Sequence, residues 1–296
     1  MLIVNPIYDV VFKYLLDDNK VAKLFIGAII GVEIDELEFR PQELPLLFSD
    51  VEETNENTPL VKVFRMDFKA KIIYPDGTIM LVLVELQKAK LDTDLMRFRR
   101  YLGAQYIDSK NTVTIDGKNK PLPIITIYFL GYTLRNFEEN PVVRVKRHYI
   151  DNYTHEIISQ KDSFIEALSH DTIVIQIPQI KHKRRNELEE ILSIFEEGNK
   201  SKFEMRFPFP GKYEEIVKRL NLALTDEQLR YAMIEQAEIV KDYKQKREQL
   251  EAYKKGIEEY KEREKEAIKR LLNENMNISK IALIFNRSEE EIKKMI

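Results

Sequence analysis

The sequence has no cysteine, and this absence excludes disulfides, a catalytic thiol and a zinc site with cysteine ligands. Long hydrophobic runs are also missing, because the longest ones, Ile79–Val84 and Pro123–Gly131, are far too short to cross a bilayer. The first residues have neither a cationic start nor a small-residue cleavage site, so they do not form a signal-peptide pattern. We therefore expect a soluble, cytoplasmic protein with no membrane partner.

A strong net charge is lacking as well. Lys and Arg number 47 and Asp and Glu number 50, which gives a net charge of −3. This balance excludes a protein that is basic over its whole surface, but it allows a basic groove beside an acidic site. The sequence contains no P-loop and no G-x-G-x-x-G motif, so nothing points to a nucleotide cofactor. Its four histidines have no metal-binding spacing.

The length and composition predict a globular chain of about two domains. The chain has 296 residues, and its 44% share of hydrophobic residues excludes wholesale disorder. We assign residues 1–235 to one domain, with a core at about 1–180 and a helical part at about 181–235. Charged residues crowd the stretch that follows, so residues 236–296 are predicted to form an all-α extension.

Helices and strands are predicted to alternate in the first domain. Residues 5–30 have apolar side chains at helical spacing and end at Gly31, which suits a helix C-cap. Residues 41–60 hold three prolines, which indicates a long connection. The later predicted elements are a helix (93–108), a buried strand (121–133), short strands (143–158 and 172–178) and helices (162–171 and 184–196).

The stretch 61–88 has the pattern of a β-hairpin. Apolar and polar residues alternate from 61 to 74, which predicts a strand with one polar face. Pro75-Asp76-Gly77 is typical of a three-residue hairpin loop, and an aliphatic strand follows it. This loop pairs Tyr74 with Thr78 and thereby sets the register of the whole hairpin.

That register predicts a polar cluster on one face of the hairpin. Asp67 falls opposite Glu85, and Arg65 falls opposite Gln87. Facing carboxylates destabilise a hairpin unless a cation lies between them, and Glu85 also lies in an otherwise apolar strand. A bound divalent cation explains both features, and oxygen ligands without cysteine suit Mg²⁺ or Mn²⁺. The alternative is an exposed acidic edge whose charge is balanced by Arg65 and Lys69.

The C-terminal residues are predicted to be helical. From 239 to 271, positions a and d of a heptad repeat are mostly apolar, which is typical of a coiled-coil seam. This helix could pair with another copy of the chain, giving a homo-oligomer through residues 239–271, or it could pack on its own domain. Residues 278–296 suggest two short helices, with Ser288 as N-cap and Glu291 as its capping-box partner.

Several motifs occur in a characteristic order. They are the D-x-x-F-K segment Asp9–Lys13, Asp67 followed by Glu85-Leu86-Gln87, a helix with Arg97, Arg100, Tyr101 and Tyr106, the strand Pro121–Gly131, and the pattern from Ile278 to Ile292. This ordered set resembles the PD-(D/E)XK nuclease superfamily, and most closely its Rpn-like branch of recombination-promoting nucleases and transposase-associated proteins. The resemblance covers most of the chain.

The resemblance implies an α/β (α+β) restriction-endonuclease-like core of order α-β-β-β-α-β, with a mixed sheet flanked by helices and an all-α C-terminal extension. It implies Asp67 and Glu85 as catalytic metal ligands for Mg²⁺ or Mn²⁺. Asp9 is a further candidate ligand, or else a capping or surface residue. Gln87 stands where many members of the superfamily have lysine, and where the Rpn-like branch often has glutamine. Its neutral amide can orient water or ligate a metal through its carbonyl, but it cannot act as a cation or a general base.

The basic helix has two interpretations. Arg97 and Arg100 could contact DNA phosphates near the site, with Lys69 as a further DNA contact. Alternatively, Arg100 could pair with Glu85 or another carboxylate of the core. We expect both arginines to lie close to the site.

The sequence therefore predicts a Mg²⁺-dependent DNA endonuclease that hydrolyses phosphodiester bonds and is linked to recombination or transposition. Asp67 and Glu85 would hold the metal, and Gln87 would position the attacking water. The missing lysine leaves open a catalytically impaired, DNA-binding scaffold on the same fold. A protein whose helical tail serves oligomerisation is a third possibility.

Overall fold

The computed structural model describes residues 2–40, 43–47, 61–65, 67–87, 92–115, 117–180, 185–195, 204–206, 211 and 213–295. The chain divides into two compact units, Met1–Met233 and Ile234–Ile296, which are described separately. Within the described ranges, none of the helices combines the length and the apolar character that a membrane span needs.

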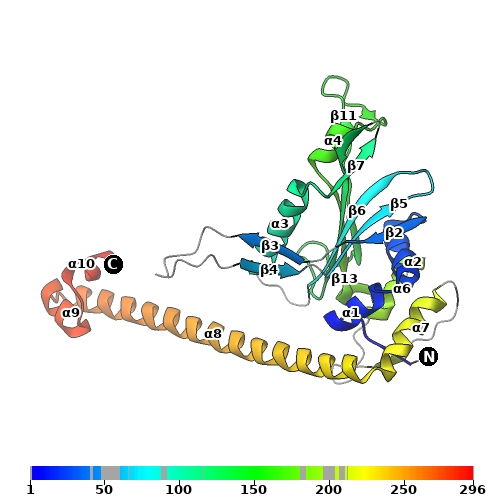
Figure 1. The fold of residues 1–296 in the computed structure, drawn as a ribbon. Helices are drawn as coiled ribbons and strands as arrows, with labels where there is room; N and C mark the ends of the chain where they lie inside the picture. Colours follow the sequence, from blue (N-terminus) through cyan, green and yellow to red (C-terminus); the bar gives the residue numbers. More distant parts are fainter. Residues whose placement is uncertain are drawn as a thin grey trace. The chain divides into compact units, whose positions relative to one another are not determined.

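A six-stranded mixed sheet is the centre of the first unit (Figure 1). Its spatial order is β10 (Val142–Val145), β13 (Asp171–Gln176), β9 (Ile124–Leu130), β6 (Ile79–Gln87), β5 (Phe68–Ile73) and β2 (Glu36–Phe39). Strands β6, β9 and β13 run parallel, and the two outer pairs, β10 with β13 and β2 with β5, are antiparallel, as are β5 and β6. The sheet is therefore mixed, as predicted.

Helices cover both faces of this sheet. Figure 1 shows α3 (Asp92–Ile107) on one side and α1 (Asp9–Leu16) with α2 (Asn19–Ile30) on the other. Every residue of β6 from Leu81 to Gln87 is buried, which explains why this strand is almost continuously apolar. Its even-numbered side chains pack towards α1 and α2, and its odd-numbered ones pack towards α3.

The predicted register of the hairpin is confirmed for its described ladder. Strands β5 and β6 pair from Phe68 opposite Val84 to Ile73 opposite Ile79. The Tyr74 amide donates to the Thr78 carbonyl at 2.9 Å. Gly77 has a φ of 81°, the positive value for which glycine was expected at this turn.

The prediction of one continuous strand from 61 to 74 is wrong. Val61–Arg65 forms a separate strand, β4, which pairs with β3 (Glu43–Leu47). Arg65 therefore lies opposite Glu43 and not opposite Gln87. Alternation reveals a strand but not its partner, and β3 also lies inside the range predicted to be a connection. The remainder of 41–60 lies outside the described residues.

The predicted helix over 5–30 is two helices. Helix α1 ends at Leu16, and α2 begins after Asp18, whose side chain accepts a hydrogen bond from the Val21 amide at 3.0 Å. An N-cap aspartate inside an apolar pattern starts a new helix because it satisfies a free amide there. The C-cap at Gly31 is confirmed by its left-handed φ of 86°.

The described part of the predicted helical segment 181–235 is not separate from the core. It contains α6 (Glu187–Leu192), the 3₁₀ helix η1 (Ser193–Phe195), α7 (Glu214–Leu222), the 3₁₀ helix η2 (Ala223–Thr225), the start of α8 and strand β14 (Glu204–Arg206). Helix α7 packs on α1 and α2, and β14 pairs with β1 (Leu2–Val4). The pairing of β1 with β14 thus joins the segment 181–235 to the beginning of the chain.

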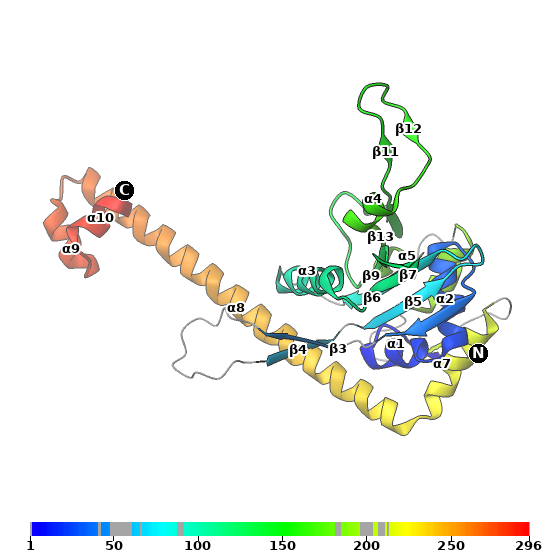
Figure 2. The ribbon, with the colours of Figure 1, turned by 45° about the horizontal axis from the view of Figure 1, so that its top comes forward.

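A thin arm rises from the far end of the sheet (Figure 2). It consists of β11 (Tyr149–Ile150) and β12 (Ile157–Ile158), followed by α4 (Ser163–Leu168). The remaining elements are the hairpin β7 (Thr112–Ile115) and β8 (Lys118–Pro121) and the short α5 (Ile177–Ile180). The short strands predicted within 143–158 correspond to β10, β11 and β12.

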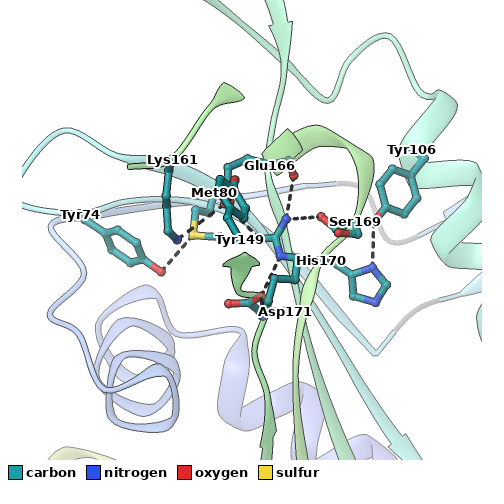
Figure 3. Close-up of polar contacts among 10 residues, drawn as sticks. Tyr74, Met80, Tyr106, Tyr149, Lys161, Glu166, Ser169, His170 and Asp171 are labelled. Carbon is teal, nitrogen blue, oxygen red and sulfur yellow. Dashed lines mark hydrogen bonds and ion pairs between the residues drawn. The ribbon is translucent and has the colours of Figure 1, made fainter. Parts of the chain in front are cut away.

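A network of polar side chains holds the base of this arm (Figure 3). Arg147 donates from Nε to Asp171 Oδ1 at 2.8 Å and from Nη2 to Glu166 Oε2 at 3.0 Å. Close by, the hydroxyl of Tyr106 on α3 and Nδ1 of His170 form a hydrogen bond of 2.8 Å. These residues bind one another, so the network accounts for the arm's attachment to the sheet.

The second unit is helical, as predicted. Helix α8 (Glu227–Asn273) enters it as one continuous helix, and α9 (Ile278–Phe285) and α10 (Glu289–Met295) follow. The predicted capping box is confirmed: the Ser288 amide donates to Glu291 Oε2 at 2.8 Å, and the Glu291 amide donates to Ser288 Oγ at 3.2 Å.

The end of α8 packs against the two short helices. Ile268, Ile281 and Ile292 form a small buried core, and Arg287 bonds the Glu264 carboxylate with two nitrogens, at 2.7 and 2.8 Å. Further back along α8, large apolar side chains at heptad spacing are exposed. They are Leu250, Tyr253, Ile257 and Tyr260.

Candidate functional site

The site lies where β6 extends beyond β5. The described ladder between these strands ends at Phe68 and Val84, although β6 continues for three more residues, to Gln87. The next β6 amide that points towards β5 is that of Leu86, and a buried amide needs an acceptor. Asp67 Oδ2 accepts this hydrogen bond at 2.6 Å. The carboxylate of Asp67 thus replaces a ladder carbonyl and is held beside β6.

Glu85 provides the second carboxylate, and it is 2% exposed. Its Oε1 accepts a hydrogen bond from Arg97 Nη2 on α3 at 2.8 Å. Its Oε2 is buried, and no donor among the described residues bonds it. A buried charged oxygen without a partner is costly, so this atom needs either a proton or a cation.

The arginine that pairs with Glu85 is therefore Arg97. The sequence had left open such a pair for Arg100, which is exposed on the same helix. Tyr101, on the next turn of α3, is buried in the core between α3 and the sheet. Only part of the predicted basic face of this helix is thus available to a ligand.

Helix α1 contributes a third carboxylate and a cation. Asp9 lies in its first turn, while the N-cap position belongs to Tyr8, so Asp9 does not cap this helix. Lys13 Nζ lies 2.9 Å from Asp9 Oδ2 and 3.6 Å from Asp67 Oδ1. Sequence reasoning did not assign Lys13 to the site. The signal was its spacing of four residues from Asp9 within the D-x-x-F-K segment.

The acidic side chains strongly affect one another. The pKa of Asp67 is raised well above its ordinary value, mainly by burial and then by the nearby charges of Glu85 and Asp9. Burial also raises the pKa of Glu85 to about 7, although Arg97 opposes this shift. Asp67 and Glu85 therefore bind a proton far more readily than exposed carboxyl groups do. A cation bound beside them would instead favour their ionised forms.

The interpretation as an exposed acidic edge is wrong. Asp67 is only 9% exposed and Glu85 still less, and Arg65 pairs with another strand. Lys69 is also buried, with its ammonium 3.8 Å from Asp108, and burial lowers its pKa. Its charge thus faces the partly exposed carboxylate of Asp108, and its contact with DNA stays a prediction.

Carboxylate oxygens are the type of ligand that a hard divalent cation prefers. Asp67, Glu85 and Asp9 come from three elements, and Glu85 Oε2 is a buried oxygen that lacks a donor in the described residues. As they stand, no three acidic or histidine side chains of the described ranges converge closely enough to ligate one ion. In this arrangement Lys13 and Arg97 supply the positive charge next to the carboxylates.

Two more features border these carboxylates. Gln87 is buried and follows Glu85 by two residues, so both side chains leave β6 on the face towards α3. A cavity of about 350 Å³ lies beside Asp67, and Lys13, Tyr14 and Phe39 also line it. The cavity gives a ligand access to Asp67 and Lys13 together.

Comparisons with protein-family models, curated proteins and solved structures found no match to this chain. The geometry of the site is therefore the basis for assigning a function to this chain.

Proposed function

We propose that this protein is a metal-dependent DNA endonuclease with a restriction-endonuclease-like core. The observation that carries the proposal is that one oxygen of the buried Glu85 has no donor among the described residues, while Asp67 and Asp9 lie close enough to affect its charge and one another's. The order along the chain also supports it. When the separate hairpins β3–β4 and β7–β8 are set aside, the elements run α2, β2, β5, β6, α3, β9, which is the α-β-β-β-α-β order that the family resemblance implies.

Each residue has a role in this proposal. Asp67, Glu85 and Asp9 would hold Mg²⁺ or Mn²⁺, which when bound polarises a phosphoryl oxygen and favours ionisation of water. Gln87 would orient the attacking water through its amide. Arg97 and Arg100 of α3 would contact the phosphates of DNA. Hydrolysis joins the water oxygen to phosphorus and breaks the bond to one sugar oxygen, which gains a proton as the water loses one.

Cleavage of supercoiled plasmid tests this function. The wild-type protein is expected to nick the plasmid with Mg²⁺ or Mn²⁺ and to lose this activity in EDTA. Asp67→Ala and Glu85→Ala are each expected to lower the rate about 100-fold or more, because each removes a charged ligand. Asp35→Ala, which removes an exposed carboxylate, controls for the change in charge. Equal cleavage by all variants would contradict the proposal.

The second candidate function is a DNA-binding scaffold without activity. The neutral Gln87 favours it, since many members of the superfamily have a cationic lysine at this position. The same plasmid experiment separates the two functions. Retardation of DNA on a gel, without cleavage in either metal, would support the scaffold.

The proposed homo-oligomer involves the exposed stripe of α8. Leu250, Tyr253, Ile257 and Tyr260 are spaced as in a coiled-coil seam. We expect the wild type to have at least twice the mass of one chain in light scattering, and Leu250→Glu with Ile257→Glu to have the mass of one chain. Lys255→Glu lies outside the a and d positions and serves as control. A wild-type mass of one chain would show this prediction to be wrong.

A further inference from the structure

The proposed endonuclease site lacks a cation at the position of Gln87. Phosphodiester cleavage concentrates negative charge on the phosphoryl oxygens, and a positioned cation stabilises that charge. Arg97 is bonded to Glu85 Oε1, and the ammonium of the buried Lys69 faces Asp108. Lys13 is also paired, with Asp9 and Asp67, but unlike Arg97 and Lys69 it lines the cavity beside Asp67.

Lys13 combines proximity with freedom to move. Its ammonium donates to Asp9 Oδ2 at 2.9 Å and lies 3.6 Å from Asp67 Oδ1, and its side chain is 35% exposed. It lines the cavity of about 350 Å³ together with Asp67, so a phosphate that enters this cavity meets both groups. Lysine has a flexible stem and a compact charge, so it can turn from one oxygen to another without any backbone change.

We propose that Lys13 is a catalytic residue that contacts the scissile phosphate and takes the place of the lysine missing at position 87. A divalent cation on Asp9 and Asp67 would repel the ammonium that now lies between them. Lys13 would then turn into the cavity and donate to a nonbridging phosphoryl oxygen. In the metal-free protein the same ammonium offsets the charge of the two carboxylates. This inference rests on the proposed endonuclease function.

The test compares Lys13→Gln and Lys13→Arg with the wild type at saturating Mn²⁺. We expect Lys13→Gln to lower kcat about 100-fold, and Lys13→Arg to retain about a tenth of the wild-type value, since it keeps the charge with a different shape. Lys20→Gln makes the same change of charge on an exposed position of α2 and should stay within about twofold. Thermal unfolding shows whether each variant is folded.

Two measurements test the two parts of this inference. Tighter binding of Mn²⁺ by Lys13→Gln tests whether the metal displaces the ammonium, and kcat at saturating Mn²⁺ separates a catalytic from a merely neutralising role. If Lys13 only offsets the charge of Asp9 and Asp67, Lys13→Gln will bind Mn²⁺ more tightly and keep its kcat within about threefold. That result would overturn the inference and leave the endonuclease function standing. A wild-type protein that cleaves in no metal would overturn both.

Discussion

Glu85→Gln is expected to stabilise the metal-free protein at pH 8 while it abolishes metal-dependent cleavage. The glutamine keeps the size of the side chain, and its amide oxygen can still accept the hydrogen bond from Arg97. It removes a negative charge from a residue that is 2% exposed. Stability and activity should therefore change in opposite directions, as is typical where a protein holds an unfavourable charge for a ligand.

The pH dependence follows from the raised pKa of Glu85. Its value in the folded protein is about 7, against an ordinary 4.5, so between these pH values the folded protein binds a proton that the unfolded chain has released. The free energy of unfolding of the wild type thus falls as the pH rises from about 4.5 to about 7. The variant escapes this loss, and its advantage at pH 8 is on the order of 2 to 3 kcal/mol.

Urea unfolding in EDTA at pH 5, 6, 7 and 8 measures this difference. Wild type and Glu85→Gln should differ little at pH 5 and most at pH 8. Glu33→Gln, at an exposed position, controls for the loss of one negative charge. Adding Mn²⁺ at pH 8 should stabilise the wild type far more than the variant. A variant less stable than the wild type at pH 8 would contradict this account of Glu85.

Phe129→Ala is expected to lower the free energy of unfolding by about 3 to 5 kcal/mol. Phe129 is fully buried on β9, and its ring centroid lies 5.2 Å from that of Phe12 on α1 and 4.9 Å from that of Phe195. The ring of Phe25 on α2 stacks on it at 6.0 Å. Its removal leaves a cavity where two helices and the sheet meet.

Denaturant titration of the wild type and Phe129→Ala measures this loss of unfolding free energy. Phe164→Ala removes the same ring from a position that is 71% exposed, and it should change stability by no more than about 0.5 kcal/mol. Phe12 belongs to the same helix as Lys13, so the loss of its contact with Phe129 should also disturb the site. We therefore expect Phe129→Ala to cleave DNA more slowly even at denaturant concentrations well below its unfolding midpoint. A loss of stability below about 1 kcal/mol would show that Phe129 is less tightly packed than its contacts indicate.

Local patterns predicted those parts of the fold that neighbouring residues control. The turn at Pro75-Asp76-Gly77 and the alternation around it determine the register of β5 and β6. The capping box of Ser288 and Glu291 likewise depends on residues only three positions apart. The helical spacing of apolar residues did not predict the break between α1 and α2. This spacing continues across Asp18 and therefore conceals the new N-cap.

The sequence by itself determined that Glu85 lies in one strand of a hairpin and that Asp67 lies next to the other strand, because the turn sets the pairing of the two strands. Only the tertiary structure decided which cations approach these two carboxylates. Lys13 is 54 residues from Asp67 along the chain, and its position depends on how α1 packs against the sheet. The pairing of Arg97 with Glu85 depends in the same way on α3. Such contacts arise from the packing of whole helices, which no local spacing of residues encodes.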